Sequence, residues 1–140
     1  MTKEKRTVFN LTAMVEPAHD LPEQWVAHVL EFDVVTQGDS PFDAYRMAFE
    51  AAMMVATDDA SEGVDPLLRR APEKYWEGFY RCMNSNPKSV ELAKVDASDR
   101  QKMYIIFFEL PLALRAETKA DHSTKPVRAA LSNDQACAHP

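Results

Sequence analysis

The sequence predicts an α+β fold built on a single small mixed sheet. Three features lead to this prediction. Apolar side chains alternate with the period of an extended strand in two segments near the N-terminus, a long amphipathic helix pattern follows them, and a β-branched and aromatic run lies near the C-terminus. The expected order of elements is β-β-β-α-α-β, and 140 residues are enough for one compact domain.

The N-terminal part should form a meander of three short strands. Residues 7–16 alternate between two faces, and residues 25–32 do so again after a proline-containing loop. After a turn at Asp33, residues 34–37 continue as a third extended segment. In the first segment Phe9, Leu11, Ala13 and Val15 share one face, and in the second Trp25, Ala27 and Val29 share one face.

A structural corner, comprising Gln37, Gly38, Asp39 and Ser40, should join the third strand to a long helix. The glycine permits backbone angles that other residues avoid, the serine is a favourable N-cap, and a proline suits the first helical position. Asp43 completes a pattern like a capping box, with aspartate in place of glutamate. Behind it, an apolar stripe has helical spacing: Phe42, Tyr45, Phe49, Ala52, Met53 and Ala56.

A second helix is predicted over residues 72–84, where one face is strongly aromatic. That face consists of Tyr75, Trp76, Phe79, Tyr80 and Met83. The helix is followed by a polar connector over residues 85–100.

The last predicted strand covers residues 103–110, the most apolar run in the chain. Both of its faces are apolar apart from one glutamate, so it should be buried on both sides and end at Pro111. From residue 115 onward the sequence has no periodicity and little large apolar surface. We therefore expect one domain, residues 1–114, and a disordered C-terminal tail, residues 115–140.

The strand, corner and helix resemble the central signature of HicB-family antitoxins. Thr36, Gln37, Gly38, Asp39 and Ser40 match that family's [TS]QGD[TS] corner, and Asp43 and Ala44 match its helix opening. The similarity covers roughly residues 7–58, although Leu30–Asp33 replace the Pro-Asp-Leu-Pro-Gly run of many members. The resemblance implies a partial ribonuclease-H-like fold, a twisted sheet with a helix across one face.

The resemblance also implies a function. The chain would be a HicB-like antitoxin that binds and masks a small basic RNA-cleaving toxin of the HicA kind, with no enzymatic activity and no cofactor or metal. We place the partner-binding surface at Trp25, His28, Glu31 and Asp33. The alternative is an orphan HicB-fold oligomeric scaffold or ligand-binding domain without a toxin partner. A short basic reading frame beside the gene would favour the antitoxin hypothesis.

Composition narrows the classes of partner. A net charge of −6 and a pI near 5.2 argue against a broad nucleic-acid-binding face and suit a basic protein partner. No helix-turn-helix or ribbon-helix-helix pattern follows Pro111, so DNA binding is doubtful. No apolar run approaches a membrane span, and Cys82 and Cys137 form neither a disulfide framework nor a metal-binding spacing, which suits the cytoplasm.

The strands expected over residues 25–32 and 103–110 are both apolar on two faces. This raises the question of what covers the second face of the sheet. The aromatic helix, another copy of the chain or a partner could do so. An uncovered strand edge would also invite pairing with another chain. We therefore expect a homodimer or a higher even oligomer.

Overall fold

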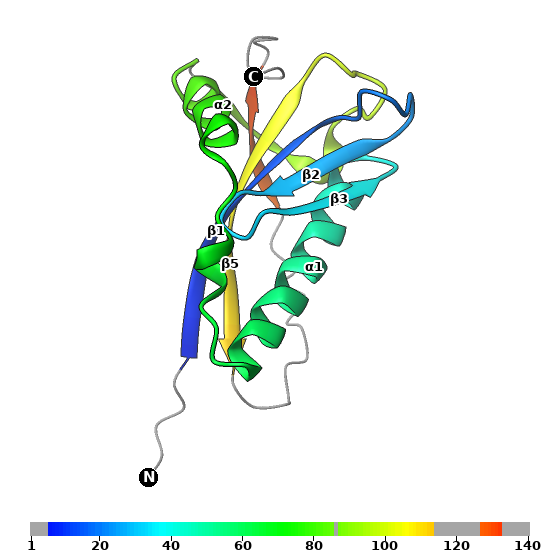
Figure 1. The fold of residues 1–140 in the computed structure, drawn as a ribbon. Coiled ribbons are helices and arrows are strands. Elements are labelled where there is room, and N and C mark those ends of the chain that lie inside the picture. The colour runs from blue at the N-terminus through cyan, green and yellow to red at the C-terminus, as the bar shows by residue number, and fades with distance from the viewer. Residues whose placement is uncertain (1–5, 86, 114–126, 133–140) are drawn as a thin grey trace.

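The computed structural model describes residues 6–85, 87–113 and 127–132. Within these ranges the chain forms one six-stranded sheet, two α-helices and two short 3-10 helices (Figure 1). The α+β class predicted from the sequence is confirmed. The strands are β1 (Arg6–Pro17), β2 (Trp25–Val29), β3 (Val34–Gly38), β4 (Lys88–Glu91), β5 (Met103–Ala113) and β6 (Arg128–Ser132). The helices are α1 (Pro41–Ser61), η1 (Pro66–Arg69), α2 (Glu73–Met83) and η2 (Leu92–Lys94).

The sheet has the strand order β3-β2-β1-β5-β6-β4, and every pairing in it is antiparallel. The prediction of a mixed sheet is therefore wrong. The longest pairing joins β1 to β5, which are far apart in the sequence. Alternation of apolar side chains reports that a segment is extended but not which way it runs beside a distant neighbour, so strand direction was not available from the pattern.

The predicted tail contributes to the sheet. Residues 128–132 form β6, which lies between β5 and β4, so the prediction of disorder over residues 115–140 is wrong for this segment. The rest of the predicted tail lies outside the described residues. The polar connector also contains a strand, β4, which pairs with β6. Both strands are short and carry small or polar residues, so their pairing depends on neighbours that local composition does not reveal.

Helix α1 crosses one face of the sheet and covers the main core (Figure 1). Its buried side chains include Tyr45 and four alanines, and the facing sheet side chains include Leu11, Ala13 and Val15. The alanines bring the helix backbone close to the sheet. Of the predicted apolar stripe, Tyr45, Ala52 and Ala56 are buried, whereas Phe42, Phe49 and Met53 are partly buried at the margin: the contact is narrower than the stripe.

Among the described residues, helix α2 covers only one end of the opposite face of the sheet. There α2 forms two small clusters, one around Cys82, Met103 and Ile105 and one around Leu30, Ala71 and Trp76. At the margin of α2, Phe107 packs edge-on against Phe79 but is still 55% exposed, and Val8 is 49% exposed. The prediction that the last strand is buried on both faces therefore holds at its start and fails at Phe107.

Pro111 does not end β5, which continues to Ala113. Leu30 N donates to Thr12 O across the end of the β1–β2 pairing, so even-numbered residues of β1 direct their backbone groups toward β2. Val8, the partner of Pro111, is one of them. The backbone nitrogen of Pro111 accordingly points away from β1. On that side of β5, β6 pairs only with residues 103–105. A proline is tolerated there because no strand in the described ranges pairs with that side of β5 at Pro111, so no ladder hydrogen bond among them needs its missing N–H.

The corner between β3 and α1 is closed by short contacts. Ser40 Oγ accepts from Asp43 N at 3.1 Å, which is the predicted N-cap, and Thr36 Oγ1 donates to Ala44 O at 2.9 Å. At Gly38 a Cβ atom would lie 2.4 Å from Ala44 N. The glycine is thus required by a backbone contact with the first turn of α1, and not by a left-handed backbone conformation as the sequence suggested.

An ion pair between a buried aspartate and a half-exposed arginine anchors the connection after α1. Asp59, which is 4% exposed, accepts from Arg69 Nε at 2.7 Å and from Arg69 Nη2 at 2.9 Å. These hydrogen bonds hold the pKa of Asp59 below its usual value. The pair joins the end of α1 to η1 and so fixes the path of the chain toward α2.

We expect Gly38→Ala to lower the free energy of unfolding by about 1–3 kcal/mol, because the new methyl group would overlap backbone atoms that cannot move independently. Gly78→Ala is the matched control. Its Cβ would meet only Met14 Cε at 4.0 Å, so the same change inside α2 should raise the stability by up to about 1 kcal/mol. Urea titrations of both variants measure this, and equal effects at the two sites would refute the packing explanation.

Asp59→Asn should make the free energy of unfolding less sensitive to acidification. A carboxylate whose pKa is lowered by folding contributes stability above its unfolded pKa, and this contribution is lost as the pH falls through the folded value. The wild type should therefore exceed Asp59→Asn in unfolding free energy at pH 7, and the gap should shrink below about pH 4. Asp58→Asn, at an exposed neighbouring position, is the control. A gap that stays constant down to pH 3 would contradict this prediction.

Candidate partner-binding surface

The turn between β2 and β3 carries two of the residues predicted to bind a partner. It comprises residues 30–33 and ends at Asp33, whose φ of 53° is left-handed, a conformation that aspartate tolerates better than most residues. The turn is held on both sides. Leu30 N donates to Thr12 O of β1 at 3.0 Å, and Leu30 O accepts from Ala71 N at 2.8 Å.

Glu31 ties this turn to β1. One carboxylate oxygen accepts from Thr12 N at 2.7 Å and the other accepts from Thr12 Oγ1 at 2.9 Å. The contact lies where the β1–β2 pairing stops, so the carboxylate satisfies a strand N–H that has no partner in β2. Because both oxygens are engaged inside the molecule, Glu31 is a structural residue in this conformation.

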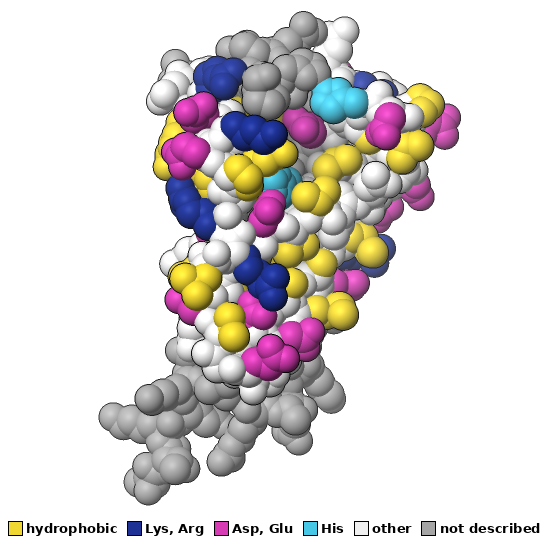
Figure 2. All heavy atoms as spheres, in the orientation of Figure 1, with side chains coloured by type: hydrophobic (Ala, Val, Ile, Leu, Met, Phe, Trp, Pro, Cys, Tyr) yellow, Lys and Arg dark blue, Asp and Glu magenta, His cyan; other side chains and the backbone are white. Residues whose placement is uncertain are grey.

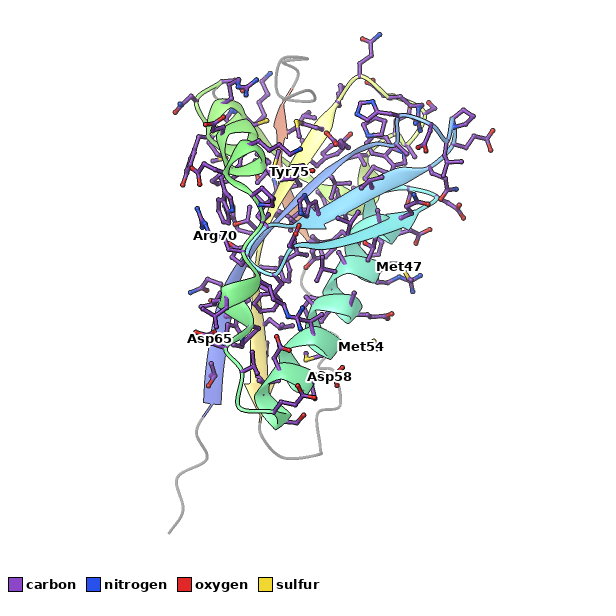
Figure 3. All side chains as sticks on the ribbon, in the orientation of Figure 1. Met47, Met54, Asp58, Asp65, Arg70 and Tyr75 are labelled. Atoms are coloured by element: carbon purple, nitrogen blue, oxygen red, sulfur yellow. The ribbon has the colours of Figure 1, made fainter. Side chains whose placement is uncertain are left out.

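His28 and Asp33 form a pair at the surface. His28 Nε2 lies 2.7 Å from Asp33 Oδ1, and the two side chains are 12% and 44% exposed. An ionised carboxylate only accepts hydrogen bonds, so Nε2 carries the proton. The ring of Tyr75 packs edge-on against the imidazole at 4.8 Å, and Lys74 Nζ lies 4.9 Å from the centre of that tyrosine ring. Figure 3 shows Tyr75 at the start of α2, beside the sheet.

Trp25 belongs to the core. It is fully buried, its ring lies 5.8 Å from that of Tyr104, and its Nε1 donates to Ala97 O at 3.3 Å. The prediction that Trp25 contacts a partner is therefore wrong for this conformation. The signal was present in the sequence, because Trp25 shares its face with Ala27 and Val29, both fully buried.

Sequence reasoning named Asp33 as a partner-binding residue but missed the rest of an exposed row along β3. Four side chains on the face away from α1 are exposed, and two of them are acidic: Asp33, Val35, Gln37 and Asp39. Val35 is 59% exposed, and Asp39 Oδ1 accepts from Gln24 Nε2 at 2.7 Å. β3 is the outermost strand, and nothing in the described ranges pairs with its far edge. In Figure 2, hydrophobic and acidic side chains are interspersed over this side of the molecule. The sequence signal for Val35 was its place in an extended segment, on the face opposite to that of Val34 and Thr36.

A polar cleft of about 410 Å³ lies at the opposite end of the sheet. Two ion pairs line it, Glu91–Lys94 at 3.3 Å and Asp99–Lys102 at 3.0 Å. Burial, followed by the nearby aspartates, raises the pKa of the Tyr104 hydroxyl at its wall. The cleft offers charges of both signs to a small polar molecule, although each of these lysines already has a carboxylate partner. The sequence of the polar connector, residues 85–100, did not indicate this cleft.

The described ranges hold neither a metal-binding cluster nor a membrane-spanning helix. No three His, Cys, Asp or Glu side chains gather there in a way that could hold a metal ion. None of the helices in the same ranges is long and apolar enough to cross a membrane.

Comparison with known proteins gives no relative: no family model, no curated protein and no solved structure matches the chain.

Glu31→Gln should destabilise the protein by about 1–3 kcal/mol, because an amide NH₂ would replace one of the acceptors that face the two Thr12 donors. Asp33→Asn is the matched comparison. It changes a partly exposed pair and should cost about 0–1 kcal/mol. Thermal and urea unfolding of the two variants separates these roles. A larger loss for Asp33→Asn than for Glu31→Gln would show that the structural residue has been misassigned.

Proposed function

We propose that this chain is a HicB-like antitoxin module that binds and masks a small basic RNA-cleaving toxin of the HicA kind. The observation that carries the proposal is the open, acidic edge at β3. The Thr36–Ser40 corner that resembles the HicB signature ends this strand and holds it against α1 through Gly38 and Ser40. The part of the chain with the family-like sequence is thus also the part whose strand has an outer edge without a partner in the described ranges.

Charge supports a basic partner. The chain carries a net charge of −6, Asp33 and Asp39 stand at the two ends of the exposed row on β3, and Asp43 lies in the next turn. Oppositely charged proteins associate faster, and complementary charge also disfavours wrong partners. An RNA-binding toxin needs a basic surface to reach its substrate, so an acidic protein that covers this surface would inhibit it.

Binding, not catalysis, is the proposed activity. Three carboxylates at or beside the β3 edge already have partners within the chain: Glu31 accepts from Thr12, Asp33 from His28, and Asp39 from Gln24. These contacts support structural and surface roles for groups that a nuclease would direct toward a metal ion.

Two observations favour the alternative, an orphan oligomeric scaffold or ligand-binding domain. The polar cleft near Tyr104 is large enough for a small molecule, and the part of the second sheet face that the described residues leave open exposes Val8 and, at the margin of α2, Phe107. The second observation suits self-association whichever function is right, so we retain the homodimer or higher even oligomer as part of the proposal.

Size-exclusion chromatography with light scattering tests both parts. At micromolar concentration the chain alone should have at least twice its 15.8 kDa mass. Mixed with the short basic protein that the proposal expects an adjacent reading frame to encode, it should elute as a heavier complex that weakens as salt is raised, since charge contributes to binding. A clean monomer would refute self-association. The absence of any complex at low salt would refute the antitoxin proposal and favour the orphan alternative.

A further inference from the structure

The backbone of β3 has a defined outward edge. The backbone N–H and C=O groups of even-numbered β2 residues point toward β1, as the Leu30 N–Thr12 O bond shows. Those of odd-numbered β2 residues therefore point toward β3. Their partners in β3 are Val34, Thr36 and Gly38. The N–H and C=O groups of Val35 and Gln37 therefore point away from the sheet. No hydrogen bond to another part of the described chain involves these groups.

We infer that the outer edge of β3 receives an extended segment of a partner protein that carries lysine or arginine, as an added strand of the sheet. The inference rests on the proposed function and specifies its binding mode. An added strand would pair with the N–H and C=O groups of Val35 and Gln37, which gives affinity without a deep pocket. Asp33 and Asp39 would face cationic side chains at the two ends of the segment.

A second copy of the chain fits this edge less well. Two β3 strands paired antiparallel about Thr36 would place Asp33 of one copy opposite Asp39 of the other. Like charges placed directly opposite each other on neighbouring strands are destabilising. A segment with basic residues at these positions would instead form opposite-charge pairs, so the acidic ends of β3 favour a different, basic chain.

The flanks of the edge provide side-chain contacts. Tyr45 and Phe49 of α1 contact Phe108 of β5, and the strand order places β3 on the other side of β1 and β2. The opposite flank of α1, toward β3, exposes Met47 (45%) and Met54 (67%) (Figure 3). Flexible methionines adapt to different apolar partners. On the other face of the sheet, the exposed side chain of Val35 lies across from His28.

Amide hydrogen exchange, followed by NMR on the full chain, tests the inference residue by residue. Two probes are added separately: the basic protein of the adjacent reading frame, and a capped seven-residue peptide of alternating lysine and valine. The amides of Val35 and Gln37 should exchange fast in the free chain and slow by about tenfold or more with a bound strand. The inward amides of Val34 and Thr36 should be protected throughout and serve as internal controls. A glutamate–valine peptide should give no protection.

A pair of variants at one position tests the backbone contribution. Val35→Pro removes an outward N–H that the sheet does not use, and it should weaken binding about tenfold, the effect of one lost hydrogen bond. Val35→Thr keeps the N–H and the β-branched shape, and should bind as the wild type does. Equal affinity for the proline and threonine variants, with both proteins folded by their melting curves, would overturn the inference.

The two probes separate failure of this inference from failure of the proposed function. If the basic protein binds while the Val35 and Gln37 amides stay unprotected, the edge is not the site, although the antitoxin proposal stands. If only the lysine peptide protects the edge, the edge assignment stands and the antitoxin proposal fails. Protection of these amides in the free chain on concentration would assign the edge to a second copy, and no protection with either probe would overturn the inference.

Discussion

The close approach of Gly38 to the first turn of α1 is the contact on which the rest of the structure depends. It lets β3 lie directly beside the helix, and the Ser40 cap and the Thr36 hydroxyl then fix the angle at which α1 begins. From this start the helix can place its buried alanines along the sheet. A side chain at position 38 would push strand and helix apart and change the packing of the whole covered face.

That covered face contrasts with the rest of the sheet. α1 covers one side, whereas α2 covers only one end of the other side, and β3 and β4 remain as edges within the described ranges. A protein that leaves an edge strand unpaired normally protects it with charge. Here Asp33 and Asp39 have that effect against another copy of the same acidic strand, while the same two charges attract a basic one. In this proposal, protection from self-pairing and selection of a partner have the same physical origin.

Much of the local structure could be predicted from the sequence. Strands β1 to β3, the Ser40 cap, both helices and most of β5 follow from periodicity and capping, because these signals are carried by residues near one another in the chain. Strand direction, the pairing of β1 with β5 and the short strands β4 and β6 depend on distant contacts that local patterns do not encode. At the candidate site, the exposure of Asp33 and the two Thr12 contacts of Glu31 required the structure, because both depend on how the turn packs on β1. Trp25 is the opposite case. It was predicted to bind a partner, although its alternation pattern already indicated a core position.

The most direct measurement of the central claim is the cleavage of labelled RNA by the basic toxin that the proposal expects an adjacent reading frame to encode, with increasing amounts of this chain. If the chain is an antitoxin that acts by masking, cleavage should stop once the chain equals the toxin in molar amount, and the chain alone with magnesium or manganese should leave RNA intact. Cleavage that continues with the chain in excess would contradict masking. Metal-dependent cleavage by the chain itself would replace the binding account with an enzymatic one.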